Sequence, residues 1–280
     1  MRIVNSNQIT NAVKEMCIEA NYFLSNDMEE AITDASTKEI SPIGKPILNQ
    51  LIENIKIAKE DLIPICQDTG MAIVFLKIGQ EVLINGTYIE DAINEGIRLG
   101  YEEGYLRKSV VKDPIIRVNT NDNTPGIIHY EIIPGDTIEI TVAPKGFGSE
   151  NMSRIYMLKP SDGIEGLKAA VLETVKLAGP NACPPIVVGV GIGGSFEKAA
   201  LLAKKALTRN VFEHSKLDHI KELEIELLQD INKLGIGPGG LGGRITALGV
   251  NILTYPTHIA GLPVAINICC HVNRHITRVI

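Results

Sequence analysis

Three cysteines stand beside polar residues in segments that the sequence marks as turns. Cys66 precedes Gln67 and Asp68 in CQDTG, Cys183 lies in NACPP, and Cys270 precedes HVNRH. Loops often carry the binding and catalytic residues of a fold. Three thiolates from distant segments could hold an iron–sulfur cluster, and because a four-iron cluster normally takes four cysteines, one iron would stay open. An open iron is a Lewis acid suited to water elimination from a hydroxy acid.

The two remaining cysteines have structural explanations. Cys17 falls on the apolar stripe of a predicted helix with Ile9 and Val13, which favours packing in a core. Cys269 and Cys270 are adjacent, so in a strand their side chains point to opposite faces and only one would join a shared site. Five widely spaced cysteines predict no disulfide framework, and without a CxxC pair no zinc knuckle is expected.

Charged and glycine residues near these turns could bind an anion. Arg107 and Lys108 follow a predicted helix, where they form either a solvated helix end or a fork for a substrate carboxylate. Gly146 and Gly148 mark a turn whose main-chain N–H groups could face an anion. His258 lies in a loop, and a buried structural histidine and a proton-handling one are equally open from the residues alone.

The run Gly189–Gly194 satisfies GxGxxG between a predicted strand and a predicted helix, which is where dinucleotide pyrophosphates bind. An acidic residue, Glu213, follows about 20 residues later. It stands in a segment that reads as helix or loop, however, and does not end a second parallel strand. Close backbone packing is therefore the preferred interpretation of these glycines, with a dinucleotide-binding module as an alternative.

Helical and strand patterns alternate along the chain. The first 60 residues read as helical, with Ser41 capping the third helix. Later strands are predicted at 71–78, 186–193 and 264–270, with two more within 126–142, and later helices are predicted at 89–105, 161–178, 195–207 and 218–234. The predicted fold class is α/β, with mixed sheet layers flanked by helices and a helical N-terminal region.

Length and composition describe an ordinary globular protein. The chain has 280 residues, of which 45% are hydrophobic and 21% charged, and length alone allows one large domain or two small ones. A net charge of −6 argues against a nucleic-acid or membrane-surface partner. With no signal-peptide pattern and no apolar stretch approaching about 20 residues, we expect a cytoplasmic protein.

Five segments in order resemble one known family: CQDTG, KGFGSENMS, NACPPIVVGVGIGG, LGIGPGGLGG and the final CxxxRH. Together they resemble the alpha chain, or N-terminal part, of the class I iron–sulfur fumarate hydratases and the related L-tartrate dehydratases. The resemblance implies that residues 1–280 form a single cluster-binding domain. It further implies a hydro-lyase of the tricarboxylic acid cycle that hydrates fumarate reversibly to malate.

The same resemblance assigns roles to residues. Cys66, Cys183 and Cys270 would bind a [4Fe–4S] cluster, and Cys270 is preferred to Cys269 because Arg274 follows it by four residues and His258 precedes it by twelve. The residues expected to contact substrate are Gln67, Asp68, Arg107, Gly148 and His258. Asp68 would also be the proton donor to the leaving hydroxyl.

The family pattern also implies a partner. Its members complete the active site with a second half, so this chain is expected to need a beta subunit, in an α2β2 assembly, and to be weakly active or inactive alone. KGFGSENMS favours fumarate over tartrate. The segment His271–His275 departs from the pattern, so nothing about redox tuning is transferred. A non-catalytic metal-binding scaffold subunit is a further alternative.

Overall fold

The computed structural model describes residues 2–280, and their contacts divide the chain into two compact units. Unit 1 contains the described residues up to Ser25, together with Ile55–Phe147 and Arg274–Ile280. Unit 2 contains Asn26–Asn54 and Gly148–Asn273. Each unit encloses its own cluster of buried apolar side chains between a sheet and helices, which confirms the predicted α/β class with mixed sheets.

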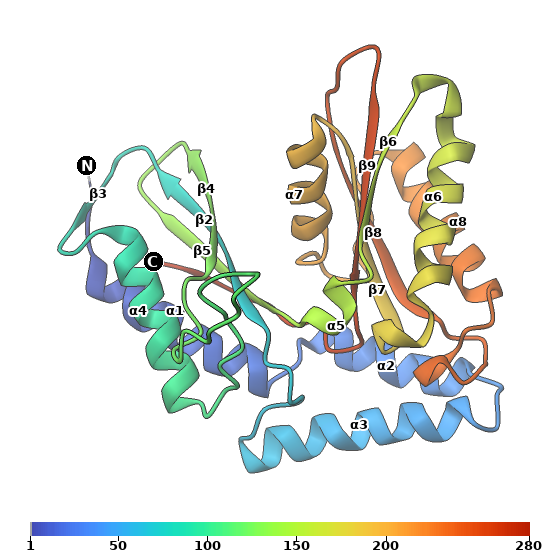
Figure 1. Ribbon diagram of the computed structural model, residues 1–280, viewed down its shortest axis with the longest axis horizontal. Helices are drawn as coiled ribbons and strands as arrows, with labels where there is room; N and C mark the ends of the chain where they lie inside the picture. Colours follow the sequence, from blue (N-terminus) through green and yellow to red (C-terminus); the bar gives the residue numbers. More distant parts are fainter. Residues whose placement is uncertain (1) are drawn as a thin grey trace. The chain divides into compact units, whose positions relative to one another are not determined.

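A four-stranded mixed sheet in the order β10-β5-β2-β4 forms the framework of unit 1 (Figure 1). Strand β2, Met71–Gly79, is the predicted buried strand. It pairs in parallel with β4, Ile127–Ile133, and antiparallel with β5, Ile138–Lys145. Strand β10, Ile276–Val279, pairs antiparallel with the other edge of β5. Strands β4 and β5 are consecutive in sequence, yet β2 lies between them.

Two helices cover this sheet. Helix α1, Ser6–Tyr22, packs against α4, Ile89–Glu103, and against β5. Cys17 on α1 is fully buried in this core, as its position on the apolar stripe predicts. A small parallel sheet pairs β1, Arg2–Asn5, with β3, Val82–Asn85.

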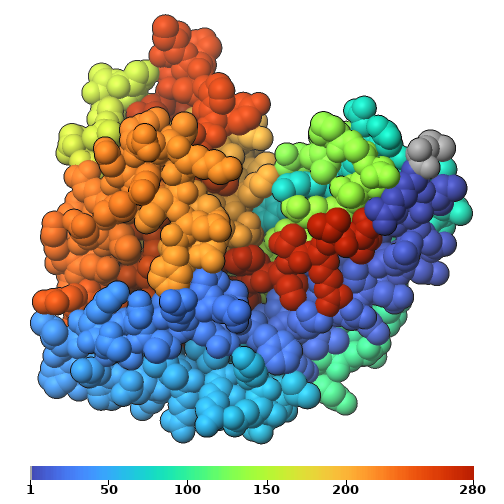
Figure 2. Space-filling model, turned by 180° about the vertical axis from the view of Figure 1, so that it is seen from behind, coloured from blue at the N-terminus to red at the C-terminus, as the bar shows by residue number. Residues whose placement is uncertain are grey.

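The C-terminal strand is tied to the first helix of unit 1. Arg278 of β10 forms ion pairs with Glu15 and Glu19 of α1. In Figure 2 the red C-terminal residues accordingly lie against the dark-blue N-terminal ones. Residues from both ends of the sequence thus complete the same unit.

Unit 2 has a second four-stranded mixed sheet, in the order β6-β9-β7-β8 (Figure 1). Strand β7, Ile186–Gly193, is parallel to β8, Ala247–Tyr255, and antiparallel to β9, Leu262–Cys269. Strand β6, Arg154–Leu158, pairs with the outer edge of β9. Only β7 and β9 were expected from the sequence.

Helices cover both faces of the unit 2 sheet. The apolar side chains of α6, Gly163–Ala178, and α8, Asp218–Lys233, share the main core with β7, β8 and β9. Helix α7, Phe196–Ala206, packs on the other face through small residues. The remaining elements are α2 Asn26–Lys38, α3 Gly44–Asp61, α5 Phe147–Glu150, η1 Pro160–Asp162, η2 Gly179–Ala182 and η3 Pro238–Gly240.

The glycines of β7 serve close packing. A side chain at Gly189 would collide with the main chain of Ala203, and one at Gly191 with that of Ala199, both on α7. Val188 and Val190 alternate with these glycines and point into the main core. The preferred interpretation of GxGxxG is therefore confirmed: β7 and α7 approach closely because the glycines lack side chains.

A second glycine-rich stretch, residues 235–243, surrounds the buried carboxylate of Glu39. Its oxygens accept main-chain N–H groups of Ile40, Ser41, Arg244 and Ile245 at 2.8–3.0 Å. Burial by itself would raise the pKa of Glu39, but these hydrogen bonds outweigh burial and hold its pKa below the ordinary 4.5. The carboxylate thus fixes this loop of unit 2.

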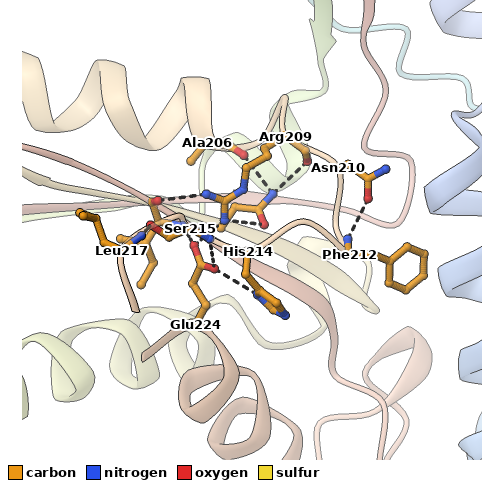
Figure 3. Close-up of polar contacts among 10 residues, drawn as sticks. Ala206, Arg209, Asn210, Phe212, His214, Ser215, Leu217 and Glu224 are labelled. Atoms are coloured by element: carbon orange, nitrogen blue, oxygen red, sulfur yellow. Dashed lines mark hydrogen bonds and ion pairs between the residues drawn. The ribbon is translucent and has the colours of Figure 1, made fainter. Parts of the chain in front are cut away.

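Glu224 of α8 is a second buried carboxylate of unit 2, and Figure 3 shows its partners. Oε1 accepts the N–H of Ile252 at 2.8 Å and pairs with Arg209. Oε2 accepts the N–H of Ser215 at 3.0 Å and lies 3.1 Å from Nδ1 of His214. Because every polar contact of this carboxylate is internal, the cluster holds the segment after α7 to β8 and α8.

Other sequence expectations have mixed outcomes. Ser41 does cap α3, since its hydroxyl accepts the N–H of Gly44 at 3.1 Å. The helical N-terminal region is confirmed by α1, α2 and α3, whereas Arg2–Asn5 form a strand because they pair with β3, 80 residues away. The spacing of Ile164 from Leu167 and Val171 predicts that it faces inward on α6, but it is 53% exposed. Ile164 lies in the first turn of the helix, and the buried positions of the helix begin at Leu167.

Candidate active site

The CQDTG segment of unit 1 forms a tight loop directly before β2. Cys66 is half-buried, Gln67 is exposed, and the Cys66 thiol donates to Oε1 of Gln67 over 3.4 Å. Thr69 and Gly70 are buried beneath them. The loop therefore presents the thiol, the amide and the carboxylate on a buried base.

The carboxylate of Asp68 is oriented by main-chain donors. Oδ1 accepts the N–H of Gly70 at 3.0 Å, and Oδ2 accepts the N–H of Phe147 at 2.9 Å. Gly146 lies so close to this carboxylate that an added side chain would meet Oδ2 at 3.0 Å. The turn that was expected to offer an N–H group to an anion thus binds a carboxylate of its own chain. Each oxygen keeps a further lone pair that could carry a proton.

Two buried side chains, those of Tyr101 and Asn123, hold the main chain of the CQDTG loop. The Tyr101 hydroxyl donates to the carbonyls of Thr69 and Gly70 at 2.8 and 3.0 Å. Burial raises the pKa of Tyr101 well above its ordinary value, so the phenol stays a donor. Asn123 donates from Nδ2 to the carbonyl of Gly70 at 3.2 Å. The side chain of Asn123 is itself fully buried.

Arg107 is tied to the same loop by its main chain. Its N–H donates to Oγ1 of Thr69 at 2.9 Å, and the Thr69 hydroxyl donates to the carbonyl of Arg107 at 3.2 Å. The guanidinium itself is exposed. Unit 1 therefore brings together four of the predicted site residues: Cys66, Gln67, Asp68 and Arg107.

Arg274 is a buried cation at this loop that the sequence identified only as a spacing marker. It is 4% exposed, and Nη2 donates to the carbonyl of Asp68. Nε and Nη1 are buried and have no hydrogen-bond partner among the described residues. A buried guanidinium with two unsatisfied N–H groups is costly unless an anion approaches it.

Two further predicted residues, Cys183 and Cys270, lie on neighbouring segments at one end of the unit 2 sheet. Cys183 follows η2, and Cys270 follows β9, which pairs antiparallel with β7 through Val187 and Cys269. Nδ1 of His271 lies 3.0 Å from the carbonyl oxygen of Cys183. This contact draws the NACPP segment to the segment that carries Cys270.

Backbone geometry and a third predicted residue mark the same end. Cys183 has φ 53° and ψ 62°, a left-handed conformation that is rare for residues other than glycine and is found at functional sites. Gly148 lies beside it, because an added side chain there would stand 3.9 Å from the carbonyl oxygen of Asn181. Unit 2 therefore groups Gly148, Cys183 and Cys270.

His258 is not part of that group. It precedes the start of β9, whereas Cys270 follows its end, so the eight residues of the strand separate them by about 25 Å. The ring is exposed and its Nδ1 accepts the N–H of Ala260 at 3.2 Å, which excludes a buried structural histidine. An apolar groove of about 470 Å³, lined also by His219 and Leu223, adjoins this loop.

The five cysteines differ in exposure, and the burial of Cys17 confirms its predicted place in a core. All are reduced. Cys66 and Cys270 are half-buried and Cys183 is exposed, whereas Cys17 and Cys269 are buried. Burial raises the pKa of Cys17 to about 12, so it stays a neutral thiol.

The donor set fits an anionic metal cluster on chemical grounds. Three accessible thiols are the ligands that iron–sulfur clusters take, and the unsatisfied N–H groups of Arg274 suit a negatively charged group near Asp68. No group of three or more His, Cys, Asp or Glu side chains within residues 2–280 is arranged as a metal site by itself.

The helices of residues 2–280 include none with both the length and the apolar character that a membrane span requires.

The sequence pattern of the fumarate hydratase (Fumerase) family matches residues 10–279, which is nearly the whole chain. The chain belongs to this family. The match includes every predicted site residue from Cys66 to Cys270 and also Arg274. Membership supports a hydro-lyase alpha subunit, in agreement with the resemblance that the five sequence segments carry.

Relatives of known name extend this result. A protein of Methanocaldococcus jannaschii, provisionally named L(+)-tartrate dehydratase subunit alpha, is 49% identical over 275 residues, which cover 95% of each chain. The L(+)-tartrate dehydratase subunits alpha of Escherichia coli strains UTI89 and K12 are each 32% identical over 278 residues, covering 96% of this chain and 91% of theirs. This family member therefore matches alpha subunits nearly end to end.

Proposed function

We propose that this hydro-lyase subunit hydrates fumarate reversibly to malate at an iron–sulfur cluster completed by a beta partner. The observation that carries the proposal is the arrangement around Asp68. Unit 1 brings together the accessible thiol of Cys66, the amide of Gln67, the oriented carboxylate of Asp68 and the main chain of Arg107. The buried guanidinium of Arg274, which has two N–H groups without hydrogen-bond partners among the described residues, contacts the same loop.

We propose Cys66, Cys183 and Cys270 as the three ligands of a [4Fe–4S] cluster, so that both units act as one cluster-binding domain, residues 1–280. Their exposure supports this assignment, and so does the chain path. Phe147, which binds the Asp68 carboxylate, is followed by Gly148, and Arg274, which binds the Asp68 carbonyl, follows Cys270 by four residues. When bound, such a cluster supplies a Lewis acid at the iron that no cysteine holds.

The residues of the chain then handle binding and one proton. Arg107 pairs with a substrate carboxylate, while Gln67 and the main chain at Gly148 bind its oxygens. In dehydration, Asp68 donates a proton to the leaving hydroxyl, which departs as water. A base on the beta partner removes the proton from the neighbouring carbon, and the double bond of fumarate forms. Hydration reverses these steps without a net change in oxidation state.

His258 needs a different placement from the other contacts. Unit 2 separates it from Cys270 by the length of β9, so a ring that touches the substrate must come from a second alpha chain. We therefore propose an α2β2 assembly in which His258 of one alpha chain serves the site of the other. Its exposed ring is consistent with that role.

L(+)-tartrate is a second candidate substrate. The alpha subunits at 49% and 32% identity carry the name of tartrate dehydratase, whereas the KGFGSENMS turn favours fumarate. Tartrate differs from malate by one additional hydroxyl group. Its recognition would require a polar group placed for that hydroxyl, and such groups discriminate strongly between substrates.

The test is an anaerobic reconstitution of the chain with iron and sulfide, with and without its beta chain. Each preparation is assayed on malate, fumarate and both enantiomers of tartrate. We expect turnover only with both chains, loss of activity in air, and recovery with ferrous iron and reductant. Comparable turnover by the single chain, or activity that is stable in air, would contradict the proposal.

Two alternatives are separated by the same preparations. A dinucleotide-binding module would gain thermal stability from NAD or NADP, and a scaffold subunit would bind iron without any response to malate. Malate should instead change the cluster spectrum, because the proposed site binds substrate directly at the metal. A silent spectrum together with nucleotide stabilisation would favour the dinucleotide alternative.

A further inference from the structure

The segment between α4 and β4 contains an exposed apolar loop next to the candidate site. Residues 108–122, here called the 108–122 loop, follow Arg107 directly. Ile115 is 87% exposed and Ile116 is 77% exposed, and Val118 is 55% exposed two residues later. Single exposed apolar residues are ordinary, but three within four positions beside a site indicate a contact surface.

The loop is held in one conformation by its own hydrogen bonds. Val111 and Asn119 form an antiparallel bridge, reinforced by the bond of 2.8 Å from the N–H of Lys112 to the carbonyl of Val118. At the tip, Oδ1 of Asp113 accepts the N–H groups of Ile115 and Ile116 at 2.8 and 2.7 Å. A partner that binds there would meet an ordered loop, which reduces the conformational entropy lost on binding.

The charge around the apolar tip defines the partner further. Residues 108–122 contain three cationic and two anionic side chains, although the whole chain has a net charge of −6. The cations are Lys108, Lys112 and Arg117. A surface with an apolar pocket and an acidic rim would complement this segment.

The loop is also connected to the candidate site through Asn123. Its Oδ1 accepts the N–H groups of Ser109 and Val110 at 2.7 and 3.2 Å, while its Nδ2 donates to the carbonyl of Gly70. Binding at the loop would therefore stabilise the segment that directly follows Arg107. The Thr69–Arg107 bonds carry the same effect into CQDTG.

We infer that the 108–122 loop is the docking surface for the beta subunit, whose apolar pocket receives Ile115 and Ile116 and whose acidic rim faces Lys108, Lys112 and Arg117. The inference rests on the proposed function, which requires a partner at this site. The beta chain is the occupant because the proposed function takes the catalytic base at Asp68 from it, and Thr69, next to Asp68, is hydrogen-bonded to Arg107, directly before this loop. A second alpha chain is an outcome that the test distinguishes. The loop thus couples assembly to the placement of Arg107.

The test measures binding without substrate. Titration calorimetry compares the affinity of a beta chain from the same organism for the wild-type chain, the double variant Ile115→Asp/Ile116→Asp and the control Ile132→Asp. Ile132 is a matched control because it is 66% exposed and also lies in unit 1. We expect at least about a 10-fold loss of affinity for the double variant only. Equal affinities for all three chains would overturn the inference.

Hydrogen exchange supplies a second measurement that does not depend on a substitution. Addition of the beta chain should slow exchange at the amides of residues 112–118. Protection that arises in the alpha chain alone and grows with its concentration would assign the loop to a second alpha chain and overturn the inference. A pair that binds through the loop but hydrates no dicarboxylate would refute the proposed function and leave the docking surface intact.

Discussion

The main-chain N–H of Phe147 donates to Oδ2 of Asp68 over 2.9 Å, which joins two segments 79 residues apart. A second N–H, from Gly70, holds the other oxygen. The carboxylate is therefore oriented before any substrate arrives. Pre-orientation of this kind lowers the cost of bringing a proton donor to a leaving group.

Replacement of the Asp68 carboxylate should lower the rate of catalysis without preventing substrate binding at the cluster. Asp68→Asn keeps one acceptor oxygen and the size of the side chain but supplies no acidic proton. We expect kcat of the reconstituted pair to fall by about 10²–10⁴-fold, the usual contribution of a general acid. The malate-induced change in the cluster spectrum should remain. An active Asp68→Asn enzyme would remove the proton-donor role from this residue.

Substitution of single cysteines should lower cluster binding at the three accessible positions and leave it unchanged at a buried one. Cys66→Ser, Cys183→Ser and Cys270→Ser should each lower the iron and sulfide bound per chain, because a hydroxyl is a poor replacement for a thiolate ligand. Cys269→Ser is the matched control, and we expect it to retain the metal. Iron loss in the control equal to that of Cys270→Ser would show that the wrong neighbour was chosen.

Thiol labelling offers an independent measurement on the metal-free chain. At pH 8 the three accessible cysteines should react with iodoacetamide, whereas Cys17 should remain unmodified. Burial blocks access to Cys17 and raises its pKa to about 12, so little thiolate forms at that pH. Peptide mass spectrometry after short exposure measures each site. Early modification of Cys17 would contradict its burial.

Arg274 should matter for anion retention more than for folding. In the metal-free chain its two unsatisfied N–H groups are a cost, so Arg274→Met should leave the free energy of unfolding within about 1 kcal/mol or raise it. The same variant should lose its cluster faster during gel filtration. Arg278→Met, which removes surface ion pairs with Glu15 and Glu19, should retain it. Large destabilisation of metal-free Arg274→Met with normal cluster retention would indicate a purely structural arginine.

The buried carboxylate of Glu39 should make unit 2 sensitive to acid. Its folded pKa lies below 4.5, so its stabilisation is present above the unfolded pKa and is lost as pH falls through the folded pKa. Glu39→Gln places an amide N–H₂ against main-chain donors and should cost about 1–3 kcal/mol at pH 7.

The measurement is denaturant unfolding at several pH values. The gap between wild type and Glu39→Gln should shrink as the pH drops below about 4.5, because protonation removes the same advantage from the wild type. Glu30→Gln, at an exposed position of α2, should stay within about 0.5 kcal/mol of wild type. A gap that is independent of pH would mean that the charge of Glu39 contributes nothing.

Local patterns in the sequence were sufficient for much of the fold. The apolar run of β2, the alternation in β5 and the stripes of α4 and α8 all predicted the observed elements, because a 2.0 or 3.6 periodicity is a local property. Strand β1 was missed since its conformation depends on β3, far along the chain. The same reason explains why β8 and β6 were not expected.

The chemistry of the site was also partly readable in the sequence. Turn context and the helical stripe separated Cys66 and Cys183 from Cys17, strand alternation admitted only one of Cys269 and Cys270, and the family resemblance chose Cys270. Cys17 and Cys269 are buried, whereas the other three are accessible, and the ligand assignment stays a prediction. Nothing local indicated that the Phe147 N–H would bind Asp68 or that Arg274 would lie buried beneath it. The CxxxR spacing was the only available signal for that arginine.

Residue types and their spacing therefore determined the kind of chemistry, the family and most secondary structure, since these depend on neighbours within a few positions. Tertiary structure alone decided which groups meet. It put Arg107 beside Thr69, drew the Cys183 carbonyl to His271, and placed His258 at the far end of β9. Strand pairing and burial involve residues tens to hundreds of positions apart, so distances of this kind follow only from the folded chain.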